Sequence, residues 1–196
     1  IIINGAMQVS QRATSATGVG ATNGEFPCVD RFPFAIGGTT AGRATVSQST
    51  DTPNGFANSL KIDVTTADTS ISADEAMFLQ TKLEGQDLQQ IKKGTSDAES
   101  LTLSFYVKGN ASATYTCELR DLDNDRINTQ TFAVTTSWNR IILTFIPDTT
   151  GSFNNDNGSS LQISFALHAG STYTGGTFAS NTWASRTQGN RVSSSN

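Results

Sequence analysis

The sequence predicts an all-β protein, an antiparallel β-sandwich of about nine strands with one short helix, and two observations carry this prediction. Apolar and polar residues alternate along most of the 196-residue chain, as expected of strands with one buried face. Ser, Thr, Asn and Gly supply about two fifths of the residues and charged residues only 15%, which suits turns better than surface helices. The 11 Phe residues, with the Ile and Leu residues, can fill one core, so we expect a folded chain.

Strands are expected wherever the alternation is clear, and clusters of Gly, Asn, Asp, Ser or Pro separate most of them. The segment 101–108, for example, places Leu101, Leu103 and Phe105 on one face. The segment 141–146 has a further apolar residue, Ile142, on its second face and is expected to be covered on both faces. Turn-separated strands of this kind predict antiparallel packing in two layers. The expected strands lie at 32–36, near 46, and at 60–64, 77–83, 101–108, 115–119, 132–134, 141–146 and 161–167.

One segment departs from this alternation and predicts the short helix. In residues 84–94, Asp87 can cap a helix, Leu88 and Ile91 lie three residues apart, and a Lys-Lys-Gly sequence ends the segment. The polar segments 13–24 and 170–196 are expected to be loops or linkers. We therefore expect an extended or linker segment over 1–30, the sandwich over 31–170, and a polar C-terminal loop over 171–196.

Charge and hydropathy argue against two classes of partner. The net charge is −4 at pH 7, which provides no basic field for nucleic acid. No apolar run approaches the roughly 18 residues that a membrane-spanning helix needs, so membrane insertion is not expected. The two cysteines, Cys28 and Cys117, have no metal-binding or redox spacing and are expected to be buried free thiols, with a single disulfide as the alternative.

Nothing in the sequence marks a catalytic site, and we expect a protein that is not an enzyme. His168 is the only histidine, at the end of a predicted strand, so any mechanism that needs an imidazole would have to use it. A solvent-facing residue is the simpler interpretation of His168. A carboxylate pair for glycoside cleavage is a matter of spatial distance, and neither Glu84 nor Glu118 stands out in the sequence.

The hairpin turn Asp121-x-Asp123-x-Asp125 suggests a calcium site, because alternating carboxylates in a turn can converge on one hard cation. The turn lacks the glycine and the glutamate of an EF-hand loop, since Arg126 and Phe132 occupy those places. A solvated hairpin tip is the alternative interpretation. No other cofactor is expected.

Two aromatic residues in the polar C-terminal segment, Tyr173 and Trp183, are candidates for binding a sugar ring. An exposed aromatic ring stacks on the apolar face of a pyranose while polar neighbours bind its hydroxyl groups. Packing of both rings onto the end of the sandwich is the alternative. Trp138 opens a predicted strand and is expected to anchor the core or an edge.

Several short motifs occur in a characteristic order along the chain. Residues 4–12 and the later Val29-Asp30-Arg31-Phe32 resemble an opening of the form "NGDFRIWQRG … ADRW". Three further segments follow in the order of the "Q-x-x-E-G", "SFWVK" and "tWkk" motifs: Gln80-x-x-x-Glu84-Gly85, Leu103-Ser104-Phe105-Tyr106-Val107-Lys108 and Ser137-Trp138-Asn139-Arg140. In these motifs and in their order the chain resembles phage tail-fibre and related virion domains, and the resemblance covers nearly all of the chain.

This resemblance implies a jelly-roll sandwich similar to carbohydrate-binding modules, carried on a bacteriophage virion. The expected function is that of a tail-fibre or other appendage domain that binds host surface polysaccharide, with other virion chains as partners and a homotrimer as the assembly. The alternative is a purely structural role in capsid decoration or tail assembly, without glycan binding. The family usually closes with one more strand, so the resemblance implies that the polar loop over 171–196 continues into a strand beyond the chain given. The resemblance assigns no ligand residues.

Overall fold

The computed structural model describes residues 1–194, and within that range strands dominate. None of the helices in this range is long and apolar enough to cross a membrane. The elements are β1 (Ser15–Val19), β2 (Phe34–Gly37), β3 (Arg43–Ser49), β4 (Ser59–Thr66), β5 (Ala76–Glu84), the 3₁₀ helix η1 (Gly85–Ile91), β6 (Leu101–Val107), β7 (Ala113–Asp121), β8 (Arg126–Val134), β9 (Asn139–Phe145), β10 (Ser159–Ala169), α1 (Ser171–Thr174), β11 (Ala184–Ser185) and the 3₁₀ helix η2 (Gln188–Asn190).

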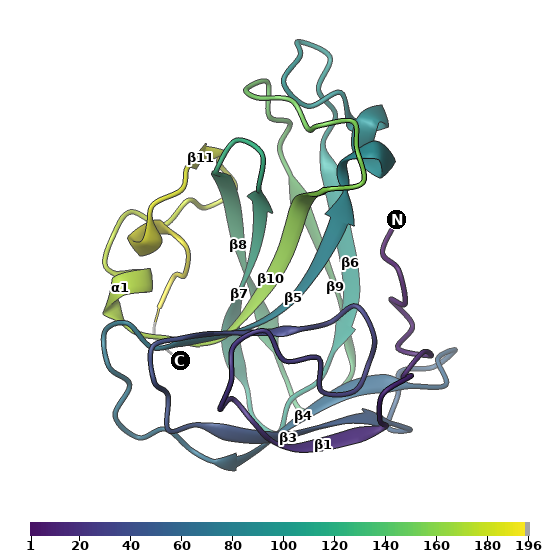
Figure 1. The fold of residues 1–196 in the computed structure, drawn as a ribbon, viewed down its shortest axis with the longest axis vertical. Helices are drawn as coiled ribbons and strands as arrows, with labels where there is room; N and C mark the ends of the chain where they lie inside the picture. Colours follow the sequence, from purple (N-terminus) through teal and green to yellow (C-terminus); the bar gives the residue numbers. More distant parts are fainter. Residues whose placement is uncertain (195–196) are drawn as a thin grey trace.

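The strands form an antiparallel jelly-roll β-sandwich, as predicted. One layer is a six-stranded sheet in the order β11-β8-β7-β10-β5-β2. The other layer consists of a three-stranded sheet, β1-β3-β4, and a two-stranded sheet, β6-β9. In Figure 1, β6 and β9 lie behind one side of the six-stranded sheet, and β1, β3 and β4 run across its lower end.

The larger part of the core lies between the six-stranded sheet and the β6-β9 pair. Alternation directs one face of each strand inward, so that Cys117 and Leu119 of β7 meet Phe145 of β9. Phe105, on β6, contacts Phe132 and Phe165 edge to face, with ring centroids 5.1 Å and 5.0 Å apart. A second apolar cluster joins the other end of the six-stranded sheet to β1 and β3. The two clusters together hold the layers in register.

The outer face of the six-stranded sheet is covered in part by the C-terminal segment. Tyr173 in α1 and Val192 after η2 are buried against Phe78 and Ala166 on that face. Figure 1 shows α1 and β11 on the side of the sheet away from β6 and β9. Residues 171–194, expected as a polar loop, thus contain three short elements and pack on the sheet, while 195 and 196 lie outside the described residues. Likewise, residues 1–30, expected as an extended or linker segment, contain β1, which pairs with β3.

The expected strands are all present, but two details of the sequence prediction were wrong. Ile142 is 58% exposed, because no described element covers the outer face of β9 at that point. The short helix begins after Glu84 without a side-chain cap, so Asp87 lies inside its first turn. Lys92 ends this helix with φ of 54°, the left-handed conformation that commonly ends helices.

Both cysteines are free and fully buried, as expected for thiols without a partner. Cys117 lies in the main core on β7, and burial raises its pKa far above the ordinary thiol value, with the adjacent Glu118 carboxylate adding to the effect. Burial also raises the pKa of Cys28. Since the thiolate is the reactive species, both groups are chemically protected in the folded state.

We therefore expect neither thiol to react with iodoacetamide at pH 8 in the native protein, and both to react after unfolding in guanidinium chloride. Intact-mass spectrometry of the two alkylated samples measures this directly. Rapid labelling of the native protein at Cys117 would contradict its place in the core.

Candidate functional site

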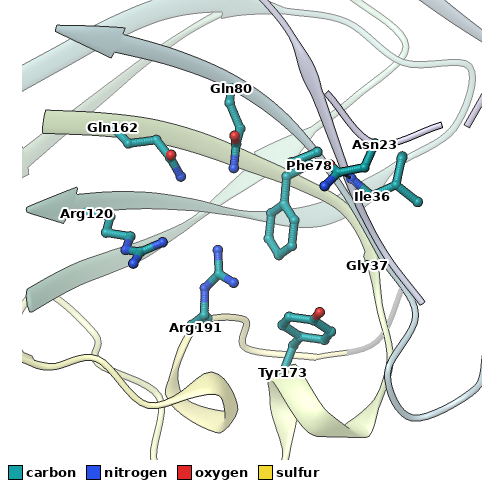
Figure 2. A pocket seen from close by; sticks show the side chains of 10 residues that line it. Asn23, Ile36, Gly37, Phe78, Gln80, Arg120, Gln162, Tyr173 and Arg191 are labelled. Carbon is teal, nitrogen blue, oxygen red and sulfur yellow. Dashed lines mark hydrogen bonds between the residues drawn. The ribbon is translucent and has the colours of Figure 1, made fainter. Parts of the chain in front are cut away.

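A polar hollow of about 240 Å³ on the outer face of the six-stranded sheet is the candidate site. The sheet forms its floor, and the C-terminal segment forms one wall. The side chains and backbone that line it come from the segment before β2, from β2, β5, β7 and β10, and from the C-terminal segment: Asn23, Ala35, Ile36, Gly37, Phe78, Gln80, Arg120, Gln162, Tyr173 and Arg191 (Figure 2).

Strand alternation places the floor residues on one face. Phe78 and Gln80 occupy alternate positions on the outer face of β5, whereas Met77 and Leu79 are directed into the sandwich. The antiparallel register sets Gln162 of β10 opposite Arg120 of β7. Because adjacent strands lie about 4.8 Å apart, the side chains of Gln80, Gln162 and Arg120 form one continuous polar surface.

The wall of the pocket is fixed by a buried ion pair. Arg191 donates from Nε to Glu118 Oε2 at 2.7 Å and from Nη2 to Glu118 Oε1 at 2.9 Å. The same guanidinium lies 4.6 Å from the ring centre of Phe78 and 5.6 Å from that of Tyr173. Burial would lower the pKa of Arg191, but the charge and hydrogen bonds of Glu118 outweigh it and raise the pKa above the ordinary value. Arg191 is thus a charged structural link between β7 and the C-terminal segment.

Three amides complete the polar lining. Gln162 Nε2 lies 2.9 Å from Ser164 Oγ, and Gln80 Nε2 lies 3.3 Å from the same oxygen. Asn23 accepts a hydrogen bond from the Ile36 amide through its Oδ1, and Figure 2 shows its amide nitrogen directed towards the pocket. Amides, a guanidinium and aromatic side chains are the groups that bind and orient a polyhydroxylated ligand.

The structure separates the two aromatic residues expected to form a sugar site. Tyr173 lines the pocket, although it is only 8% exposed because it packs edge to face on Phe78. Trp183 does not line it, since its Nε1 donates to the Ile146 carbonyl at 2.8 Å and its ring packs against the main core. Trp138, expected as an anchor, donates from Nε1 to Asp51 Oδ1 at 3.0 Å.

The three carboxylates expected to bind calcium have different partners. Asp121 is fully buried and binds the Lys93 ammonium, whereas Asp123 accepts hydrogen bonds from Asn154. Asp125 pairs with Arg120 at 2.9 Å. Within the described residues, no group of three acidic, histidine or cysteine side chains could hold a metal ion. The structure therefore corrects the expectation of a calcium site formed by these three residues.

A protein cation, the ammonium group of Lys93, binds the first carboxylate of this turn instead. The Lys93 Nζ lies 2.5 Å from Asp121 Oδ2 and 3.1 Å from Asp148 Oδ2, and it donates to the Thr150 and Gly151 carbonyls at 2.8 Å and 2.7 Å. These four oxygens surround a side chain that is 3% exposed. Two carboxylates and two carbonyls form the kind of oxygen set that hard cations prefer, and here the ammonium group supplies the charge.

The histidine at the end of β10 is half buried, which differs from the expected solvent-facing position. Burial lowers the pKa of His168, while Asp68 and Glu75 act in the opposite direction. Its Nε2 is buried with no hydrogen-bond partner among the described residues. His168 does not line the pocket described above.

Of the ten lining residues, nine were not identified from the sequence, among them Gln80, Arg120, Gln162 and Arg191. The first three belong to strands that were predicted, on the face opposite the apolar one. Polar residues on the outer faces of several strands were the available signal for a pocket. The sequence does not give the order of the strands in the sheet, so it does not show that these residues are neighbours. Arg191 pairs with a residue 73 positions away, and no local pattern indicates such a contact.

Comparison with known proteins gives little further information. No protein-family model matches the sequence, and no curated protein matches it. One solved structure, described as "CBM4 structure and function", is similar to this chain. The alignment covers 85% of this chain and 88% of the other, with 16% sequence identity and a TM-score of 0.43. At that level, the similarity carries no information about ligand or site.

Replacement of Lys93 by Met is expected to lower the free energy of unfolding by about 3–5 kcal/mol, since it leaves Asp121 and Asp148 buried without their shared cation. Urea unfolding followed by fluorescence measures the change. The matched control is Lys92→Met, because Lys92 and its partner Glu99 are 53% and 62% exposed and an exposed pair contributes at most about 1 kcal/mol. Equal effects of the two variants would contradict the role assigned to Lys93.

The pH dependence of stability tests Asp148 separately. Although burial opposes it, hydrogen bonds from Arg126 and Lys93 lower the pKa of Asp148 below its ordinary value of 3.8. The charged form therefore stabilises the folded state above pH 3.8, and this contribution is lost as the pH falls through the lower folded-state pKa. We expect Asp148→Asn to be destabilised at pH 7 and to lose less further stability than the wild type on acidification.

Urea unfolding at pH 7 and at successively lower pH values measures both effects. Asp97→Asn is the control, because Asp97 lies on the surface. If the stability of the Asp148 variant fell on acidification as much as that of the wild type, groups other than Asp148 would be responsible for the pH dependence.

Proposed function

We propose that this protein is a structural component of a bacteriophage virion, a tail-fibre or other appendage domain, and that the outer-face pocket binds glycans of the host surface. The order of motifs from Asn4 to Arg140 supports the virion assignment. The jelly-roll sandwich supports it in general terms, because a rigid sheet can present a binding surface on an extended appendage.

The pocket is the observation on which glycan binding depends. Its amides, from Asn23, Gln80 and Gln162, offer both donors and acceptors to sugar hydroxyl groups. Phe78 and Tyr173 supply an apolar side, as in other sites where a few polar groups orient a ligand over aromatic rings. None of the ten lining residues is an acid, a histidine or a cysteine, so the lining suits binding by hydrogen bonds and ring contact.

The oligomeric state would determine the overall affinity of the protein for the host surface. A shallow polar site gives low affinity for a single sugar, because hydrogen bonds to the ligand replace hydrogen bonds to water. A homotrimer would present three copies to the same surface and raise the overall affinity through effective concentration. Trimerisation is therefore part of the proposal.

A purely structural virion role is the second candidate, and one surface feature favours it. Phe56 and Tyr106 are 40% and 41% exposed and contact each other edge to face, with ring centroids 5.6 Å apart. Ile142, also exposed, lies on the neighbouring strand β9. Such a group of large apolar side chains on the second layer suits a contact with another virion protein.

The test is a binding assay on an array of bacterial surface polysaccharides, with Gln80→Ala as the pocket variant. We expect the wild type to bind at least one polysaccharide and the variant to bind about five- to tenfold more weakly, as for loss of one or two hydrogen bonds. Gln90→Ala is the control, since Gln90 is exposed in η1 away from the pocket.

Two results would contradict glycan binding at this site. No binding to any polysaccharide by a folded, assembled protein would favour the structural role. Binding that Gln80→Ala and Gln90→Ala leave equally unchanged would place the glycan elsewhere on the surface.

A further inference from the structure

Two of the residues that line the pocket, Arg120 and Arg191, are cationic and none is a carboxylate, although the whole chain carries a net charge of −4. Three guanidinium groups cluster on this side of the sheet, those of Arg120, Arg186 and Arg191. Glu118 neutralises Arg191. The remaining two share one carboxylate, Asp125, at 2.9 Å from Arg120 and 3.8 Å from Arg186. One guanidinium charge in this group is therefore not balanced by a carboxylate.

The titration of Arg186 is consistent with this imbalance. Burial lowers its pKa first, and the charges of Arg120 and Arg191 lower it further, while Asp125 and Glu118 only partly compensate. The electrostatic field that lowers the pKa of Arg186 disfavours positive charge beside these guanidinium groups, and it therefore favours an anion there.

Arg191 and Arg120 both line the pocket, but Glu118 binds the Arg191 guanidinium through both carboxylate oxygens, which leaves Arg120 as the group open to a ligand. Figure 2 shows the Arg120 guanidinium directed towards the space between Gln162 and Arg191. Its side chain is 26% exposed, and one nitrogen, Nη2, is committed to Asp125 at the turn. Its Nε has no hydrogen-bond partner among the described residues. A guanidinium with five N–H donors is thus only partly used by the protein.

The rest of the lining would not repel an anion. Asp125, which holds Arg120, is 56% exposed at the tip of the β7-β8 hairpin, and Glu118 is fully engaged by Arg191. The amide groups of Gln80 and Gln162 add further N–H donors on the floor. Hydrogen bonds from charged donors are stronger than those from neutral ones, so an anionic group would gain most beside Arg120.

We infer that the pocket takes a saccharide unit that bears an anionic group, a carboxylate or a sulfate, and that Arg120 recognises its charge. This inference rests on the proposed glycan binding and narrows it to one class of ligand. Neutral sugar hydroxyl groups would occupy the amides, and the anionic substituent would lie against the guanidinium.

The experiment compares polysaccharides that differ only in charge. The carboxylate pair is polygalacturonate and its methyl ester, and the sulfate pair is chondroitin sulfate and its desulfated form; sialylated and desialylated oligosaccharides are added as a further carboxylate pair. Binding by the assembled wild-type protein is measured for each member by biolayer interferometry, at low salt and at 0.5 M NaCl. The variants are Arg120→Gln, Arg120→Lys and, as a matched control on the opposite layer, Arg140→Gln, each checked for an unchanged melting temperature.

We expect the wild type to prefer the anionic member of at least one pair by about tenfold or more, as for a charge-assisted hydrogen bond. Salt should weaken the anionic member selectively. Arg120→Gln should remove most of the preference while leaving neutral members within about twofold, Arg120→Lys should retain part of it, and Arg140→Gln should retain all of it. Which pair shows the preference identifies carboxylate or sulfate.

The possible failures are distinguishable. Equal binding of both members of every pair would overturn the anionic ligand while leaving glycan binding intact. A preference for anions that Arg120→Gln does not reduce would overturn the role of Arg120. The absence of binding to every polysaccharide, neutral or charged, would overturn the proposed function itself.

Discussion

The buried ion pair between Glu118 and Arg191 determines the form of the outer face of the six-stranded sheet. Glu118 lies in the middle of β7, and burial of its carboxylate without a cationic partner would be costly because an unpaired charge would lose its hydration. Any segment that covers this carboxylate must therefore provide a cation. The C-terminal segment brings that cation, and with it Tyr173 and Val192, which pack on Phe78 and its neighbours. The pocket exists in the space that this segment leaves open towards Gln80 and Arg120. Its shape therefore depends on one long-range contact.

A second buried cation, the ammonium group of Lys93, fixes loop segments at the end of β7. Lys93 follows η1, Asp121 ends β7, and Asp148 lies in the connection after β9. One ammonium group thus ties together three parts of the chain that no hydrogen-bonded ladder joins. Arg126 adds a bidentate contact to Asp148, with hydrogen bonds of 2.8 Å and 3.0 Å. Both charged centres use side chains to fix irregular segments onto a regular sheet.

The strands were predictable because alternation is a local property, and residues such as Leu103 and Phe105 carry it without knowledge of the rest of the chain. The strand β1 was missed because Ser15–Val19 contains little apolar sequence and forms through its pairing with β3. The charged residues were harder to interpret. The turn from Asp121 to Asp125 looked like a cation site, and a cation is present, but the lysine that provides it lies 28 residues before Asp121. Exposure was also misjudged at Ile142, because the sequence does not show how many layers cover a strand.

The two edges of the six-stranded sheet bear on how copies of this protein can associate. One edge is β11, with two residues, and the other is β2, with four. An edge this short exposes few unpaired backbone groups, and it offers little length for a strand of another chain to extend the sheet. Accidental growth of the sheet into larger aggregates is disfavoured for the same reason. Another chain is therefore not expected to extend the six-stranded sheet at either of its two edges, and contacts with this layer are expected to use side-chain surfaces, where specificity can be encoded.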